Sequence, residues 1–148
     1  MHRPRTTATH QPEPELTLHA EVTIDTRLVV WKDDQLSLNH RKGKHVNTSR
    51  QTALWRGLGA RASIRVPRIP ADHTARYVVL IRFPDGRHRD AVNYTPMVKA
   101  LVDGAVQEAK VATDDSWPHC IGQDARELRP PGELEIILQI WTGPLLVS

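Results

Sequence analysis

Alternation of apolar and polar residues predicts strands at several places along the chain. In the segment Leu16–Trp31 the even-numbered side chains from 16 to 24 are apolar, which indicates one long strand or a strand with a bulge. The segment Ala75–Phe83 is apolar enough to be a central strand, and Glu133–Trp141 alternates again as a final strand. A short strand is predicted at Ser116–Ile121, and Gly122–Gly132, which contains two adjacent prolines, is predicted to be a loop.

Helical periodicity predicts two main helices. The first runs from a cap at Thr48 or Ser49 to about Ile64, with leucine and alanine at helical spacing and arginines pointing elsewhere. The second occupies Pro96–Ala109, because Thr95 stands at the N-cap position and a proline is tolerated in the first helical turn.

The order strand, helix, strand, helix, strand predicts an α+β fold with a mixed β-sheet packed by two main helices. We expect this domain to span residues 16–143. Residues 1–15 are rich in proline and threonine and poor in apolar side chains, which predicts a disordered N-terminal tail, and residues 144–148 form a short C-terminal tail.

Charge is distributed unevenly along the chain. No acidic residue occurs from Gln35 to Ala71, a segment that contains an irregular basic loop, Leu36–Asn47, and the first predicted helix. Such a stretch is typical of a surface that binds a polyanion, with a solvated helix face as the alternative. From Asp72 onward eleven acidic residues stand against eight basic ones. The residues expected to contact nucleic acid are Arg41, Lys42, Lys44, Arg50, Arg56 and Arg61, with Arg87 and Arg89 further along.

Candidate chemistry is concentrated in and around the second predicted helix. Asp90 precedes this helix, and the pair Asp114 and Asp115 follows it. A helix that leaves and returns can bring such distant carboxylates together. Lys99 and Asp103 are four residues apart, so they project from one face of the helix. Carboxylate oxygens are the ligands that hard cations such as Mg²⁺ prefer, so this segment is a candidate metal site.

The same residues resemble the RusA-like Holliday junction resolvases of bacteria and their phages. In that family a basic run ends in Asp-x-Asp-Asn, and a helix follows with lysine, then aspartate four residues on, then an Asp-Asp pair. The matching residues here are Arg87, Arg89, Asp90, Asn93, Lys99, Asp103, Asp114 and Asp115. The resemblance extends upstream to Leu36–Asn39 and covers roughly Leu16–Trp141.

The resemblance implies a magnesium-dependent, structure-selective endodeoxyribonuclease, a crossover junction endonuclease that acts as a homodimer on four-way junctions or other branched DNA in recombination and repair. It implies Asp90 and Asp115 as metal ligands with Asp114 as a weaker third, and Mn²⁺ as a substitute for Mg²⁺. Lys99 would stabilise charge on the phosphate or the leaving oxygen, and Asn93 would orient a water or a ligand carboxylate. The alternatives are a solvated turn for the pair Asp114 and Asp115, an ordinary salt bridge to Asp103 for the lysine, and a loop-holding role for the asparagine.

Two positions depart from the family pattern. Val92 stands where the family has its second aspartate, and Lys110 stands where it usually has the glycine that ends the helix. Because an isopropyl group cannot ligate a cation, a second hypothesis is a branched-DNA-binding protein of the same fold that is catalytically impaired. A third hypothesis is an unrelated small basic nucleic-acid-binding domain.

Other classes of protein are disfavoured by the sequence. No run of about 18 apolar residues is present, so we expect no transmembrane helix and no membrane partner. The opening segment lacks the apolar centre of a signal peptide. Cys120 is the single cysteine, which excludes an intramolecular disulfide and fits a reducing, cytoplasmic location.

Overall fold

The computed structural model describes residues 15–38, 48–85 and 90–145. Almost all of the predicted N-terminal tail and most of the basic loop, including Asn39, lie outside these residues. The expected nucleic-acid contacts that also lie outside them are Arg41, Lys42, Lys44, Arg87 and Arg89.

The described chain alternates strands with helices. Its elements are β1 (Thr17–Thr23), the short helix α2 (Trp31–Asp34), α3 (Ser49–Ala62), β2 (His73–Arg82), the 3₁₀ turn η2 (Ala91–Tyr94), α4 (Thr95–Asp103), the π-helical segment η3 (Gly104–Glu108), β3 (Cys120–Glu127) and β4 (Glu135–Pro144). Within these elements, no helix has both the length and the apolar character needed to cross a bilayer.

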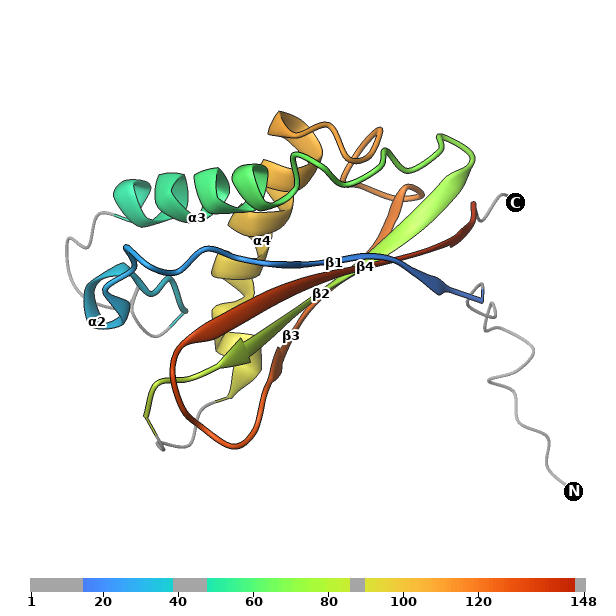
Figure 1. Ribbon diagram of the computed structural model, residues 1–148. Helices are drawn as coiled ribbons and strands as arrows, with labels where there is room; N and C mark the ends of the chain where they lie inside the picture. Colours follow the sequence, from blue (N-terminus) through green and yellow to red (C-terminus); the bar gives the residue numbers. More distant parts are fainter. Residues whose placement is uncertain (1–14, 39–47, 86–89, 146–148) are drawn as a thin grey trace, which may run out of the picture.

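The described strands form one mixed sheet in the order β1-β4-β2-β3. β4 runs antiparallel to β1 and β2, whereas β3 runs parallel to β2. Figure 1 shows α3 and α4 together on one face of this sheet. The predicted α+β fold, with a mixed sheet packed by two main helices, is therefore confirmed.

The two-residue repeat of the strands separates a buried face from a polar face. The side chains of the central strands that face the helices are 0% exposed: Tyr77, Val79, Ile81, Ile136, Leu138 and Ile140. On the other face Arg76 pairs with Asp124, and Arg82 pairs with Glu135. The apolar core thus lies between the sheet and the two helices, and the site residues are carried on the helices and on the loops at their ends.

Two glycines allow α3 and α4 to pack with their backbones almost in contact. A Cβ atom at Gly104 would lie 2.0 Å from the carbonyl oxygen of Arg56, and one at Gly59 would lie 2.2 Å from that of Leu101. No side chain fits at either distance, so both positions require glycine. This contact sets Arg56 beside the end of α4.

The first strand is shorter than the prediction and ends at Thr23. The predicted bulge is present, because the register with β4 shifts between Leu18 and Ala20. Trp31 was expected at the end of the strand but begins α2, where it is 9% exposed and stacks on Tyr94 with ring centroids 5.6 Å apart. Packing of the indole against the core therefore prevails over its β propensity.

The prediction of a loop at Gly122–Gly132 is wrong, because β3 continues to Glu127. Its residues are half-buried on both faces apart from one exposed position, and the strand pairs with β2 along one edge only. An edge strand of this kind is specified by backbone hydrogen bonds rather than by apolar alternation. The segment Gly-Gln-Asp-Ala-Arg-Glu accordingly shows no strand signal.

The helix that contains α4 and η3 ends in a left-handed residue. Lys110 has φ 61°, and the N–H of Val111 donates to the carbonyl of Ala105 at 3.0 Å. This is the geometry that glycine normally provides at a helix C-terminus. Lys110 stands where the resembling family usually has glycine, and its left-handed backbone is one that favours glycine.

Replacing Lys110 by glycine should stabilise the protein. A left-handed conformation costs a non-glycine residue about 1–2 kcal/mol, part of which glycine loses again through its freer unfolded state, so we expect about 1 kcal/mol more unfolding free energy in urea titration. The control is Ala109→Gly, one residue earlier at φ −84°, which should lower the unfolding free energy by about 0.5–1 kcal/mol. Equal effects at the two positions would show that the left-handed backbone of Lys110 is not strained.

Candidate functional site

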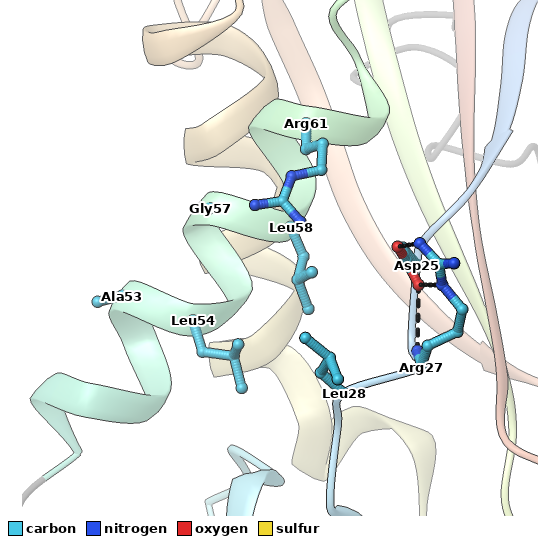
Figure 2. Close-up of a pocket in the computed structure, with 8 residues that line it drawn as sticks. All are labelled: Asp25, Arg27, Leu28, Ala53, Leu54, Gly57, Leu58 and Arg61. Atoms are coloured by element: carbon cyan, nitrogen blue, oxygen red, sulfur yellow. Dashed lines mark hydrogen bonds and ion pairs between the residues drawn. The ribbon is translucent and has the colours of Figure 1, made fainter.

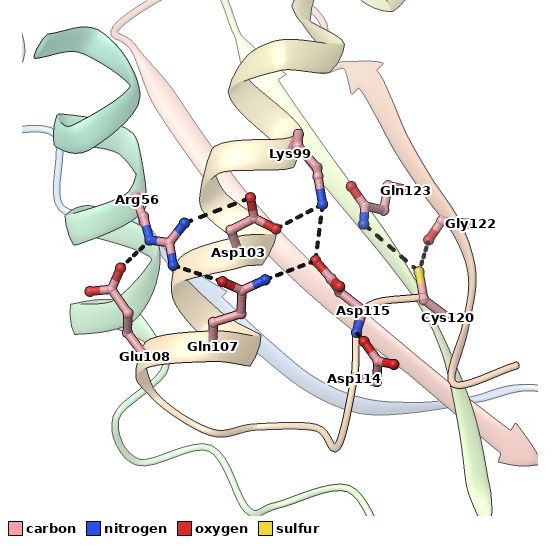
Figure 3. Close-up of polar contacts among 10 residues, drawn as sticks. All are labelled: Arg56, Lys99, Asp103, Gln107, Glu108, Asp114, Asp115, Cys120, Gly122 and Gln123. Atoms are coloured by element: carbon pink, nitrogen blue, oxygen red, sulfur yellow. Dashed lines mark hydrogen bonds and ion pairs between the residues drawn. The ribbon is translucent and has the colours of Figure 1, made fainter. Parts of the chain in front are cut away.

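A cluster of charged side chains lies between α4 and the loop that precedes β3. The Lys99 ammonium donates to Asp103 Oδ1 and to Asp115 Oδ2, both at 2.9 Å (Figure 3). Lys99 and Asp103 come from successive turns of α4, and Asp115 comes from the loop. The structure thus brings together two of the residues predicted to be catalytic, Lys99 and Asp115, and adds Asp103.

The members of this cluster differ in their exposure. The side chains of Asp103 and Asp115 are 16% and 13% exposed, whereas that of Lys99 is 54% exposed. Removing two carboxylates from water is unfavourable unless donors or cations compensate them. Lys99 supplies this compensation and remains accessible to an approaching molecule.

The two carboxyl groups have opposite pKa shifts. Burial, reinforced by a hydrogen bond with Asp115, raises the pKa of Asp103. Hydrogen bonds from Asp103 and then from Lys99 hold the pKa of Asp115 below its usual range. Burial alone would lower the pKa of Lys99, but its bonds to the two carboxyl groups outweigh burial and raise it. The cluster therefore combines a firmly protonated lysine, an ionised Asp115, and an Asp103 that takes up a proton first as the pH falls.

The end of α4 adds further contacts to the cluster. Arg56 of α3 donates to the Glu108 carboxylate, and its Nη2 donates to Gln107 Oε1 at 2.8 Å. The Gln107 amide donates to Asp115 Oδ2 over 3.5 Å, and the Arg56 guanidinium lies 3.9 Å from Asp103. Arg56, which was expected to contact nucleic acid, is therefore already paired with partners in its own chain, although its side chain remains 35% exposed.

Asp90 and Asn93 are held by contacts within the turn before α4. Asp90 is the N-cap of η2, and its Oδ1 accepts from the N–H of Val92 at 3.2 Å. The N–H of Asn93 donates to the carbonyl of Asp90 at 3.0 Å, and the carbonyl of Asn93 accepts from the N–H of Leu38 at 2.7 Å. These contacts fix the turn against the segment that leads into the basic loop.

The Asp114 carboxylate accepts hydrogen bonds from the two residues that follow it in the loop. Its Oδ1 accepts from the N–H of Asp115 at 2.7 Å, and its Oδ2 accepts from the Ser116 hydroxyl at 2.9 Å. Across the described parts of the chain, no three His, Cys, Asp or Glu side chains are close enough to hold a metal ion. The expected ligands Asp90, Asp114 and Asp115 therefore do not form one three-carboxylate group here, and the carboxyl groups that do meet are those of Asp103 and Asp115.

Arg50, another expected nucleic-acid contact, supports α2. Its Nη2 donates to Asp34 Oδ1 at 2.8 Å, and the second oxygen of Asp34 accepts from the N–H of Val30 at 2.7 Å. The Asp34 side chain is 8% exposed. Because a buried carboxylate needs a partner, Arg50 has a structural role whether or not it also contacts a phosphate.

Arg61 lies on the other side of α3, at a groove of about 650 Å³ between this helix and the segment after β1 (Figure 2). Leu28, Leu54 and Leu58 line the groove, and Leu28 is 91% exposed. The facing wall carries Asp25, whose pKa is held well below its usual range by hydrogen bonds from Arg27 and, to a smaller extent, by the charge of Arg61. Unlike Arg50 and Arg56, Arg61 thus faces an open surface.

A smaller hollow of about 210 Å³ opens beside the charged cluster. Lys99 and Asp103 form one side of it, and Thr48 and Thr52 at the start of α3 form another. The cluster can therefore be approached from the end of α3 that follows the basic loop.

No protein-family model matches the chain, and no curated protein matches it. Its function is therefore inferred from the site.

From the sequence, Asp103 was placed beside Lys99 on one helix face and among the residues that match the family pattern, but not among the catalytic residues or metal ligands, and Gln107 was not found. The available signal was their spacing, because residues 99, 103 and 107 recur every four positions and share one face of a helix. The contact of Gln107 with Arg56 had no sequence signal, since it depends on how α3 packs against α4.

Removing the Lys99 ammonium should destabilise the protein in a pH-dependent way. In Lys99→Met the two carboxyl groups face each other without a cation, which should lower the unfolding free energy by about 1 kcal/mol near pH 7. The pKa of folded Asp115 lies below 3.8, so the stability it contributes is present above pH 3.8 and is lost as the pH falls through its folded pKa.

The difference between wild type and Lys99→Met should therefore shrink in urea titrations at pH 3 relative to pH 7. Lys32→Met, at an exposed position of α2, is the matched control and should show no such trend. A Lys99→Met deficit that does not change with pH would exclude the carboxyl pair as its cause.

Arg50→Ala and Arg61→Ala should have different consequences although both residues lie on α3. The first leaves Asp34 buried without its partner and should lower the unfolding free energy by about 1–2 kcal/mol. The second removes an exposed group at the groove and should change stability by less than about 0.5 kcal/mol. Thermal and urea denaturation of both variants tests this, and equal stability would contradict a structural role for Arg50.

Proposed function

We propose that this chain is a magnesium-dependent, structure-selective endodeoxyribonuclease of the RusA-like kind, which acts as a homodimer on four-way junctions or other branched DNA in recombination and repair. The observation that carries the proposal is the bridging of Asp103 and Asp115 by Lys99 at 2.9 Å on each side. Phosphodiester hydrolysis needs positive charge beside the phosphate and oxygen ligands for a cation, and this cluster offers both.

The donor set suits a hard divalent cation. Mg²⁺ binds oxygen ligands and commonly takes only one or two carboxylates from the protein, with water and substrate phosphate in the remaining positions. Asp115 and Asp103 would be these carboxylates, and Asp90 is the further ligand that the family resemblance implies. When bound, the cation would offset the negative charge of the attacked phosphate and lower the pKa of its bound water.

Lys99 is the group of this chain that would act on the phosphate itself. An ammonium has three N–H donors, and two of them are used by Asp103 and Asp115. Because the side chain is 54% exposed, the third donor is accessible to a phosphate oxygen or to the leaving oxygen. The carboxylates that position the ammonium also keep it protonated at neutral pH.

The basic segment and the proposed dimer would supply recognition. Arg61 and the basic residues of the loop before α3 would contact phosphates, which provides affinity but little sequence information. A four-way junction must be cut in two strands placed symmetrically, and two copies related by a twofold axis would present two such sites.

A second candidate function is branched-DNA binding without efficient cleavage. It is favoured by Val92, which stands two residues after Asp90 and is 58% exposed on the η2 turn. A large apolar side chain in this position cannot hold a cation, so the site would lack one of the ligands that the resemblance implies. Magnesium would then be held more weakly and positioned less firmly.

Val92→Asp distinguishes the two candidates. Because Val92 is exposed, the new carboxylate would not be buried, and the variant should fold normally. We expect wild type to bind a four-way junction in Ca²⁺ but to cut it slowly in Mg²⁺, and Val92→Asp to cut at least about tenfold faster, which corresponds to 1.36 kcal/mol of transition-state stabilisation. Val92→Asn, of nearly the same shape without the charge, is the control and should not accelerate cleavage.

Three other outcomes would each contradict part of this proposal. Fast cleavage by wild type that Val92→Asp does not improve would show that the carboxylate count is wrong. Junction binding without cleavage in either protein would leave the binding function. Equal affinity for junction and duplex would favour an unrelated basic nucleic-acid-binding domain.

A further inference from the structure

The segment that ends α4 has an unusual backbone. In η3 the N–H of Ala109 donates to the carbonyl of Gly104, five residues back, at 3.0 Å. A π turn holds more residues than an α turn, so it changes the direction of the side chains that follow, and such turns are frequent at functional sites. Here it directs Gln107 and Glu108 into the space between α3 and the Asp115 loop (Figure 3).

The partners of Gln107 determine which end of its amide faces which neighbour. The Arg56 guanidinium can only donate hydrogen bonds, so the atom 2.8 Å from its Nη2 must be the amide oxygen of Gln107. The amide nitrogen then faces Asp115 Oδ2 at 3.5 Å. Arg56 is itself held by Glu108 and by the glycine contact at Gly104.

This orientation constrains the Asp115 carboxylate. Its Oδ2 receives the Lys99 ammonium at 2.9 Å and the Gln107 amide at 3.5 Å. Two donors on one oxygen, arriving from different turns of one helix, restrict rotation of the carboxylate about its bond to the Cβ atom. Neither of these donors contacts the other oxygen, Oδ1.

We propose that Gln107 is a positioning residue: oriented by Arg56, it fixes the Asp115 carboxylate in the orientation that the site requires. The proposal rests on the proposed function in one respect, namely that Asp115 acts on the phosphodiester through a bound cation. A clamp that merely joined the two helices would not need an amide, because a glutamate at position 107 would bind Arg56 at least as strongly.

Gln107→Glu is therefore the decisive variant. It keeps an acceptor for Arg56 and replaces the donor that faces Asp115 by a repelling oxygen. We expect its melting temperature to be unchanged or higher, and its kcat for junction cleavage to fall roughly 10- to 100-fold with KM unchanged. Glu133→Gln, at an exposed position outside this cluster, is the control, and it should leave kcat unchanged. Both variants are measured in wild type or in the Val92→Asp protein, whichever cuts.

A second measurement does not depend on cleavage. The side-chain amide signals of Gln107 in a ¹⁵N NMR spectrum should shift in Asp115→Asn and in Arg56→Lys, and should stay in place in Glu133→Gln. If the protein cuts DNA and Gln107→Glu retains full kcat, the positioning role is overturned while the proposed function stands. If no cleavage occurs, the proposed function fails. If, in addition, the Gln107 amide signals do not shift in Asp115→Asn and Arg56→Lys, the positioning role is overturned as well.

Discussion

The close backbone contact between α3 and α4 is the constraint on which the rest of the site depends. A Cβ atom at Gly104 would lie 2.0 Å from the carbonyl of Arg56, so any other residue there would push the helices apart. The contact holds the Arg56 backbone beside the start of η3, which places its guanidinium within reach of Glu108, Gln107 and Asp103. The close helix approach that the two glycines permit thus also determines which charged side chains lie near one another. The π turn begins at the same glycine, which ties the backbone irregularity to this contact as well.

Acidic and basic side chains alternate along the charged network of the site. Along the network Glu108, Arg56, Asp103, Lys99 and Asp115, every charged group has a neighbour of opposite sign. Loss of a cation from this network would leave the largely enclosed carboxylates of Asp103 and Asp115 with less compensation, which costs more than the pair contributes. The opposite pKa shifts of Asp103 and Asp115 follow from the same arrangement, because two carboxyl groups that share one ammonium cannot both ionise equally easily.

The sequence predicts those features that depend on local patterns. Periodicity gives both helices and the central strand, and the four-residue spacing of Lys99 and Asp103 gives one side of the site. Features that depend on tertiary contacts are not predicted. The strand β3 is held by backbone bonds to β2 rather than by apolar residues, and Trp31 leaves the strand region because the aromatic core offers it better packing. Arg56 likewise has the sequence context of a solvated basic helix, and only the packing of α3 on α4 shows that it faces acidic partners.

The two halves of the proposed site differ in how they are held, and this difference bears on the choice between cleavage and binding alone. Lys99 and Asp103 lie on a helix packed against α3, and Lys99 holds Asp115 of the loop, whereas Asp90 and Val92 belong to a turn held by a few hydrogen bonds. Partly buried ion pairs are poor contributors to stability, since apolar residues of similar size often replace them without loss. Stability alone therefore does not account for two carboxylates enclosed at 16% and 13% exposure. Under the proposed function these charges would act on a ligand, and Val92, rather than the lysine cluster, would then be the position that limits the rate of cleavage.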